Sequence, residues 1–168
     1  MNLNNLFQNF CKKNNLEINA YQLTIVNKIE SFYTSNFNKS IFKKFFLKDN
    51  SKQVFYLHGG VGVGKTMILN FFFDLVEEKK LRLHFNEFML SFHDFVHQRK
   101  EKNEENIIYQ FVKDLKSKTE LIYFDEFQVT NIVDAMILGK LFEQILNENI
   151  QIILTSNTRI SELYKDGL

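Results

Sequence analysis

The chain carries, between an apolar run and a helix-like segment, the sequence Gly59-Gly60-Val61-Gly62-Val63-Gly64-Lys65-Thr66. It fits the pattern G-x-x-x-x-G-K-[ST], with the apolar run Val54 to Leu57 before it and a helical pattern from Lys65 to Glu78 after it. That order of strand, glycine-rich turn and helix is the context in which this pattern forms a phosphate-binding loop. Glycines let the backbone curl so that N–H groups face phosphate oxygens, and the helix adds its positive N-terminal end.

The loop predicts a role for each of its parts. We expect the backbone of residues 59–64 to hold the phosphates of a nucleotide, and Lys65 to reach the β and γ phosphates. The hydroxyl of Thr66 is expected to bind Mg²⁺. The alternative is a glycine-rich turn with an exposed lysine and no ligand, but a turn needs one or two glycines and this loop uses four.

A pair of carboxylates, Asp125 and Glu126, ends a second apolar run, Leu121 to Phe124. Burying charge at the end of an apolar strand is costly unless a cation compensates it. We expect Mg²⁺ near Thr66 to be that cation, with Asp125 as its partner through water. Glu126 is then placed to orient or deprotonate the water that attacks the γ-phosphate. A solvated pair that starts a turn is the alternative.

The last apolar run, Ile150 to Leu154, leads directly into Thr155-Ser156-Asn157. If this strand lies beside the strand of the phosphate loop, a polar side chain at its end faces the γ-phosphate, because ligands sit beyond the carboxyl ends of parallel strands. Asn157 could then hold the nucleophilic water. The same residues could instead make a turn or cap a helix after Arg159.

Apolar runs alternate with helical patterns along the rest of the chain, which predicts βαβ units and a parallel sheet covered on both faces. The fold class is therefore α/β, of the three-layer αβα type. Strands are expected at Val54 to Leu57, Leu81 to Phe85, Leu121 to Phe124 and Ile150 to Leu154. Helices are expected at Lys65 to Glu78, Phe88 to Arg99, Glu104 to Ser117 and Ile132 to Asn147. Residues 1–50 are expected to form an N-terminal region of two or three helices, and residues 51–168 the nucleotide-binding core.

Composition narrows the class of protein. The chain has 168 residues, a formal net charge of +1 and a single cysteine, so we expect no disulfide framework and no nucleic-acid or lipid binding through bulk charge. The longest apolar runs are far short of the ~20 residues that span a bilayer. The first residues match neither a secretory signal nor a mitochondrial presequence, so a cytoplasmic location is expected.

With these motifs in place, the sequence resembles the ZapE cell-division ATPases and their lactation-elevated mitochondrial relatives, within the AAA+ class. The resemblance is carried by four segments: Tyr56 to Asp74, Leu83 to His97, Ile122 to Ile145 and Leu154 to Leu168. It implies an AAA+ P-loop fold, ATP with Mg²⁺ as ligands, and Asn157 as the residue called sensor one. It also implies a protein partner that is remodelled or regulated, and homo-oligomeric rings with the sites between subunits.

The chain also departs from this family. Relatives continue beyond the position of Leu168 with an arginine-bearing segment, a fifth strand and a helical lid, so the core is expected to be incomplete and to bind ATP yet turn it over poorly. Arg159 is the only arginine expected near the site, and a surface or helix-start role suits it better than a catalytic one. Asn86 and Glu87 stand where relatives carry basic or aromatic residues, which weakens the case for a substrate contact from a loop there.

Other candidates have plainer interpretations. His93 and His97 are spaced as zinc ligands can be, but no third ligand is evident, so partly buried or capping histidines are favoured. Cys11 is expected to be an unreactive side chain. The run Phe71 to Phe73 is expected to pack against the sheet, with a partner-binding face as the alternative.

Three functions remain open at this point. The first is an ATP hydrolase that acts on a protein partner. The second is a nucleotide-gated binding module, for example for nucleic acid as in helicase loaders, which predicts salt-dependent DNA binding that requires ATP. The third is a chain without activity, which predicts no ATP binding.

Overall fold

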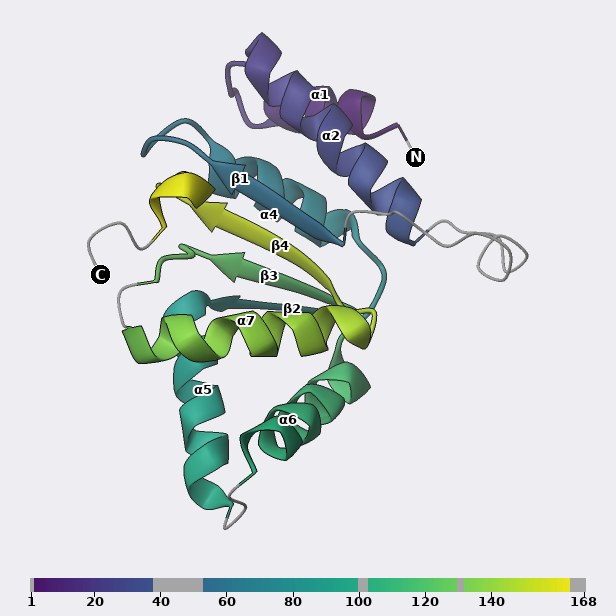
Figure 1. Ribbon diagram of the computed structural model, residues 1–168. Helices are drawn as coiled ribbons and strands as arrows, with labels where there is room; N and C mark the ends of the chain where they lie inside the picture. The colour runs from purple at the N-terminus through teal and green to yellow at the C-terminus, as the bar shows by residue number, and fades with distance from the viewer. Residues whose placement is uncertain (1, 38–52, 100–102, 130–131, 164–168) are drawn as a thin grey trace.

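The computed structural model describes residues 2–37, 53–99, 103–129 and 132–163. Its sheet has the strand order β1-β4-β3-β2, and all three strand pairs are parallel. The strands are β1 (Val54–His58), β2 (Lys80–His84), β3 (Leu121–Asp125) and β4 (Gln151–Ser156). Their carboxyl ends therefore meet at one edge of the sheet (Figure 1). The predicted parallel sheet, with the last strand beside the strand of the phosphate loop, is confirmed.

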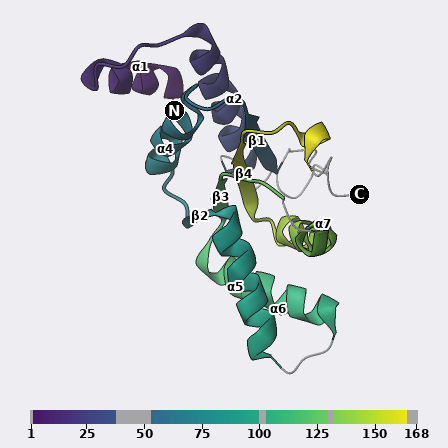
Figure 2. The same ribbon diagram turned by 90° about the vertical axis from the view of Figure 1, so that its left-hand side faces the viewer.

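Helices cover both faces of the sheet. They are α1 (Leu3–Lys13), α2 (Ala20–Asn36), α4 (Lys65–Leu75), α5 (Phe85–Gln98), α6 (Glu104–Lys118) and α7 (Ile132–Asn147), followed by the short 3₁₀ helix η1 (Ile160–Glu162). Helices α1, α2 and α4 lie on one side of the sheet, and α5, α6 and α7 on the other (Figure 1). Figure 2 shows α5 and α6 extending away from the sheet as a pair. The three-layer arrangement agrees with the predicted fold class. None of the helices in the described ranges is long and apolar enough to cross a bilayer.

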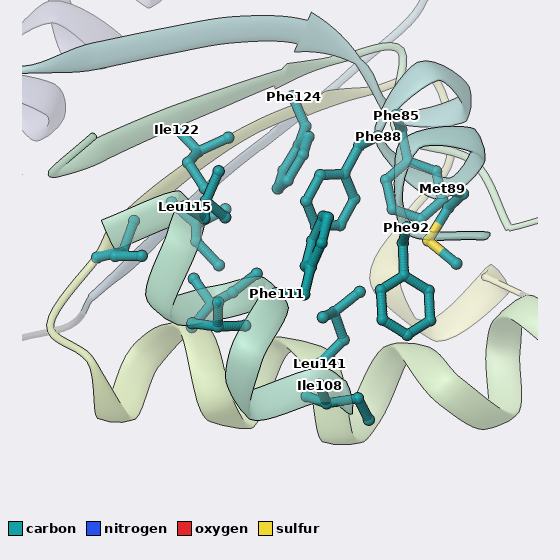
Figure 3. Close-up of a cluster of buried hydrophobic side chains, with 14 of the residues drawn as sticks. Phe85, Phe88, Met89, Phe92, Ile108, Phe111, Leu115, Ile122, Phe124 and Leu141 are labelled. Carbon is teal, nitrogen blue, oxygen red and sulfur yellow. The ribbon is translucent and has the colours of Figure 1, made fainter. Parts of the chain in front are cut away.

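Strand β3 divides the core into two clusters because its side chains alternate between the faces of the sheet. Leu121 and Tyr123 pack into the cluster with α4, and Ile122 and Phe124 into the cluster with α5, α6 and α7 (Figure 3). All four side chains are fully buried. A strand buried on both faces reads in sequence as a continuous apolar run, which is why this strand was predictable.

The N-terminal helices share a core with the phosphate-loop helix. Phe7 of α1 is fully buried, and its ring contacts that of Phe71 in α4 at 5.2 Å between centroids. Cys11 is a free, buried thiol in the same cluster, and burial raises its pKa, which agrees with a packing role. The division into residues 1–50 and 51–168 stays a prediction, and a third N-terminal helix would fall mostly within residues 38–52, outside the described ranges.

The predicted boundary between β2 and α5 is wrong by a few residues. Phe85 is the first residue of α5 and not the last of a strand, and the helix begins three residues before Phe88. The cause is a capping box, in which the Glu87 carboxylate accepts a hydrogen bond from the backbone N–H of His84. Asn86 and Glu87 consequently lie in the first helical turn and not in a loop.

Helix α4 is shorter than predicted and ends at Leu75 instead of Glu78. The ammonium group of Lys80 donates hydrogen bonds to the carbonyls of Phe73 and Val76, at 2.7 Å for the latter. The Phe73 carbonyl also accepts from the backbone N–H of Val76 at 3.3 Å. The last carbonyls of a helix lack the regular donor four residues on, so a lysine at this end stabilises the earlier stop.

We predict that Phe124→Ala lowers the free energy of unfolding by about 3–5 kcal/mol, because the ring is fully buried and leaves a cavity. The ring lies 4.7 Å from that of Phe88 and 5.9 Å from that of Phe142, so both sides of the cavity are walled by aromatic groups that do not collapse easily. Chemical denaturation measures the effect. Leu90→Ala on α5, where the side chain is 63% exposed, is the control and should change the value by about 0.5 kcal/mol or less. Equal losses in the two variants would contradict the described core.

Candidate functional site

A cavity of about 360 Å³ opens at the carboxyl ends of the strands. It is lined by Val61, Gly62, Gly64, Lys65, Thr66, Met67, Asp125, Glu126, Thr155, Ser156 and Asn157. The structure thus brings together the loop residues Lys65 and Thr66, the acidic pair and Asn157, which come from three separate parts of the sequence. Gly59, Gly60 and Val63 belong to the same loop but do not line the cavity.

The loop between β1 and α4 depends on two glycines. Gly62 and Gly64 have φ angles of +82° and +88°, in the left-handed region that side chains disfavour. Gly64 is the N-cap of α4 and offers no side chain to its first turn. The first backbone N–H groups of α4 are therefore left for other acceptors, and the helix end carries partial positive charge. This is the arrangement that binds phosphate oxygens.

Lys65 is buried and its ammonium group is fully hydrogen-bonded. It donates to the carbonyls of Gly59 and Gly60, each at 2.8 Å, and to Oδ1 of Asn157 at 2.9 Å. An ammonium group has three N–H donors, so these acceptors use all of them. The hydrogen bond from Lys65 to Asn157 connects the end of the phosphate loop with the end of β4. Lys65 and Asn157, predicted to face the same phosphate, are direct neighbours here.

Asp125 is 5% exposed and both of its carboxylate oxygens accept hydrogen bonds. Thr155 Oγ1 donates to Oδ1 at 2.6 Å, and Arg82 Nη2 donates to Oδ2 at 2.6 Å. Burial by itself would raise the pKa of Asp125, but the hydrogen bonds from Thr155 and Arg82, with the charge of the guanidinium group, outweigh it and hold the pKa below its ordinary value.

This arrangement adds to one prediction and corrects another. Arg82 is a cation beside the buried carboxylate of Asp125 that was not predicted from the sequence, and the pairing of Asp125 with Mg²⁺ stays a prediction. Arg159 is consequently not the only arginine near the site; it is exposed and forms the N-cap of η1, in line with the helix-start role expected of it. The sequence carried a signal for Arg82, a lone arginine between two leucines of a strand, but nothing in the sequence names its partner.

Glu126 differs sharply from Asp125 in exposure. Its side chain is 78% exposed, and Oε2 lies 3.8 Å from Nδ1 of His84, whose side chain is 53% exposed. A contact between two side chains this open to solvent contributes little to stability. The φ angle of Glu126 is +56°, a costly value for a residue with a side chain, and its backbone N–H is held by Thr155 Oγ1 at 3.1 Å. At this strained turn the carboxylate of Asp125 is buried and that of Glu126 faces solvent.

The residues present fit a magnesium site of the kind found with nucleotides. Thr66 and Asp125 line the same cavity, and Mg²⁺ in such sites takes only one or two protein ligands, with water and phosphate oxygens completing its shell. No group of three or more His, Cys, Asp or Glu side chains that could hold a metal occurs among the described residues. His93 is engaged elsewhere, with Nε2 2.8 Å from Oδ1 of Asp134, which agrees with a partly buried structural histidine.

The family of the chain follows from a comparison with protein-family models. The model described as AFG1-like ATPase matches residues 7–168, which include the phosphate loop, the acidic pair and Asn157. The chain belongs to the AFG1-like ATPase family. Membership confirms the resemblance noted in the sequence.

Two curated relatives match most of this chain over a small part of their own length. Lactation elevated protein 1 homolog B of Danio rerio is 40% identical over 131 residues, which are 72% of this chain and 26% of that protein. Cell division protein ZapE of Escherichia coli K12 is 40% identical over 116 residues, 67% of this chain and 30% of that protein. The chain thus spans less than a third of the length of either relative.

Solved structures support the fold of this AFG1-like chain. DnaI has a TM-score of 0.51 at 19% identity and covers 89% of this chain and 73% of its own. Domain III of the Thermotoga maritima replication initiation protein DnaA has a TM-score of 0.50 at 19% identity and covers 66% of this chain and 46% of its own. At this identity the likeness shows the P-loop AAA+ fold alone, and it confirms the predicted fold class.

We predict that Gly64→Ala lowers the free energy of unfolding by about 1–2 kcal/mol, because Ala is strained at a φ of +88°. Its Cβ would also lie 3.2 Å from Nε2 of Gln22. Gly60→Ala is the matched control: no atom lies within 4 Å of its added Cβ, and a change within about 0.5 kcal/mol is expected. Thermal and chemical unfolding of the two variants make the comparison. A Gly60 variant as unstable as the Gly64 variant would count against the described loop.

Proposed function

We propose that this chain binds ATP with Mg²⁺ in the cavity at the end of the sheet and that the site is built for hydrolysis. The observation that carries the proposal is the meeting of Lys65, Thr66, Asp125, Glu126 and Asn157 around one cavity. Membership of the AFG1-like ATPase family supports it.

In this proposal the loop backbone and Lys65 bind the phosphates. Lys65 exchanges its carbonyl acceptors, those of Gly59 and Gly60, for β and γ phosphate oxygens, so the charge stays paired throughout. Thr66 and Asp125 hold Mg²⁺, which when bound neutralises charge on the phosphates. Because the Lys65 ammonium is already positioned at the loop, little reorganisation is needed on binding.

Two exposed side chains remain to act on water. Glu126 is the general base or orienting group for the attacking water, since its carboxylate is exposed and lines the cavity. Asn157 lies beside Lys65 and can hold a water against the γ-phosphate while its Oδ1 or amide remains hydrogen-bonded.

The wider role rests on relatives and is proposed with them. One relative is a cell division protein, and we propose that ATP turnover here is likewise coupled to a protein partner, in a homo-oligomeric ring in the cytoplasm. The chain spans 26% to 30% of the length of the relatives, so such activities belong to the longer architecture. The net charge of +1 disfavours nucleic acid as the partner.

We predict that Lys65→Ala weakens ATP binding on the order of 10- to 100-fold, because it removes the charged donor to the phosphates. Titration with a fluorescent ATP analogue measures the affinity. Lys140→Ala on α7 is the control, since that ammonium group is exposed and pairs only with Glu104 at 3.1 Å among the described residues. Unchanged affinity in the Lys65 variant would overturn the proposed nucleotide site.

Glu126→Gln is expected to retain ATP binding and to lower single-turnover hydrolysis about 10²- to 10⁴-fold, the range of a general base. The control is Glu120→Gln, the same change at the opposite end of β3, where the side chain is exposed and outside the cavity. Single-turnover release of phosphate from ATP is the measurement. Hydrolysis equal to wild type in the Glu126 variant would remove this residue from the mechanism.

A further inference from the structure

Each oxygen of the Asp125 carboxylate accepts a hydrogen bond from a side chain. Thr155 Oγ1 donates to one oxygen and Arg82 Nη2 to the other, both at 2.6 Å. The terminal torsion of an aspartate is broad and two-fold, so the side chain alone does not choose an orientation for its carboxylate. The hydrogen-bond donors on its two oxygens fix the orientation of the carboxylate. Each oxygen keeps a further lone pair for another donor or a metal-bound water.

Arg82 is itself held in place. Its guanidinium carbon lies 5.1 Å from the ring centroid of Tyr123, which is fully buried and packs against Phe73 at 6.0 Å. The register of β2 on β3 pairs Arg82 with Tyr123 and His84 with Asp125, so Arg82 reaches diagonally to the carboxylate. Arg82 does not line the cavity. It can therefore contact a ligand there only by way of Asp125.

Two effects of Arg82 on a cation bound at Asp125 oppose each other. Its positive charge repels the cation, whereas its hydrogen bond fixes the carboxylate that the cation needs. The side chain of Arg82 is 37% exposed, so solvent screens the repulsion, while the hydrogen bond is short and ends on a carboxylate that is 7% exposed. Orientation is therefore the larger effect, as for partners that hold metal ligands in other proteins.

We propose that Arg82 is a positioning residue that holds the carboxylate of Asp125 in the orientation in which it takes up Mg²⁺ with ATP. The inference rests on the proposed function and adds to it a residue from the edge strand β2. Thr155 is the second donor of the same clamp, but its hydroxyl also accepts from Glu126 N–H, so Arg82 gives the cleaner test.

The test compares the affinity for a non-hydrolysable fluorescent ATP analogue in excess Mg²⁺ and in chelator, and takes the ratio as the gain due to Mg²⁺. The variants are Arg82→Met, which keeps the apolar stem over Tyr123, Asp125→Asn, and the double variant. We expect Arg82→Met to lower the gain about 10-fold or more and to leave the affinity in chelator unchanged. We expect the double variant to lose no more than Asp125→Asn alone, because both act through one carboxylate.

Lys80→Met is the matched control. Lys80 lies on the same strand with its ammonium group 4.9 Å from the ring centroid of Phe73, but it caps α4 and makes no contact with Asp125 among the described residues. It should keep the wild-type gain. If Arg82→Met does not fold, Arg82→Lys, which keeps a charge and a donor, should lower the gain in the same direction by a smaller factor.

Several outcomes would overturn the inference. They are a gain that is unchanged or larger in the folded Arg82 variant, an equal loss in Lys80→Met, and losses that multiply in the double variant. Failure of the wild-type chain to bind the analogue at all is a different result, because it would sink the proposed nucleotide site itself.

Discussion

Strand β4 is buried along its whole length between β1 and β3, and the geometry of the cavity depends on this placement. Its end ties both neighbours: Ser156 O accepts from Gly59 N–H at 3.2 Å, and Thr155 O accepts from Phe127 N–H at 2.6 Å. Ser156 Oγ donates to Phe127 O at 2.7 Å. The phosphate loop and the acidic pair are thereby held beside each other. A register slip of one residue would turn Thr155 away from Asp125, because side chains alternate between faces.

The two buried charges of the site are fully partnered within the protein. Lys65 has three oxygen acceptors, and Asp125 has a hydroxyl and a guanidinium donor. An unpaired charge at such burial would be strongly destabilising, so these pairings are a condition of folding as well as of binding. In the proposed function, ATP would exchange hydrogen-bond partners at this cavity instead of ordering a loose site, which lowers the cost of binding.

Sequence patterns located most of the secondary structure. Burial of each strand or helix in the core leaves an apolar pattern within its own stretch of sequence. The buried strand β3 appears as an unbroken apolar run that ends at Asp125, and β4 contains the run Ile152 to Leu154. Helices α6 and α7 follow their helical periods almost to the residue. The errors fall where a side chain outside the pattern sets a boundary. A capping box between His84 and Glu87 begins α5 earlier than predicted, and hydrogen bonds from Lys80 end α4 earlier than predicted. Neither contact alters the spacing of the apolar residues, so the sequence pattern does not show them.

The sequence by itself determined the phosphate loop and the acidic pair, because each depends on residues that are neighbours in the chain. It also determined the family, because four segments each carry a recognisable local pattern. The glycines allow the backbone conformation of the loop, and the apolar strand directly before Asp125 identifies that residue as a candidate ligand. Only the tertiary structure decided the partner of that carboxylate. Arg82 lies 43 residues away and reaches Asp125 through the register of two parallel strands. Register follows from the packing of whole faces of the sheet, so no local pattern contains it.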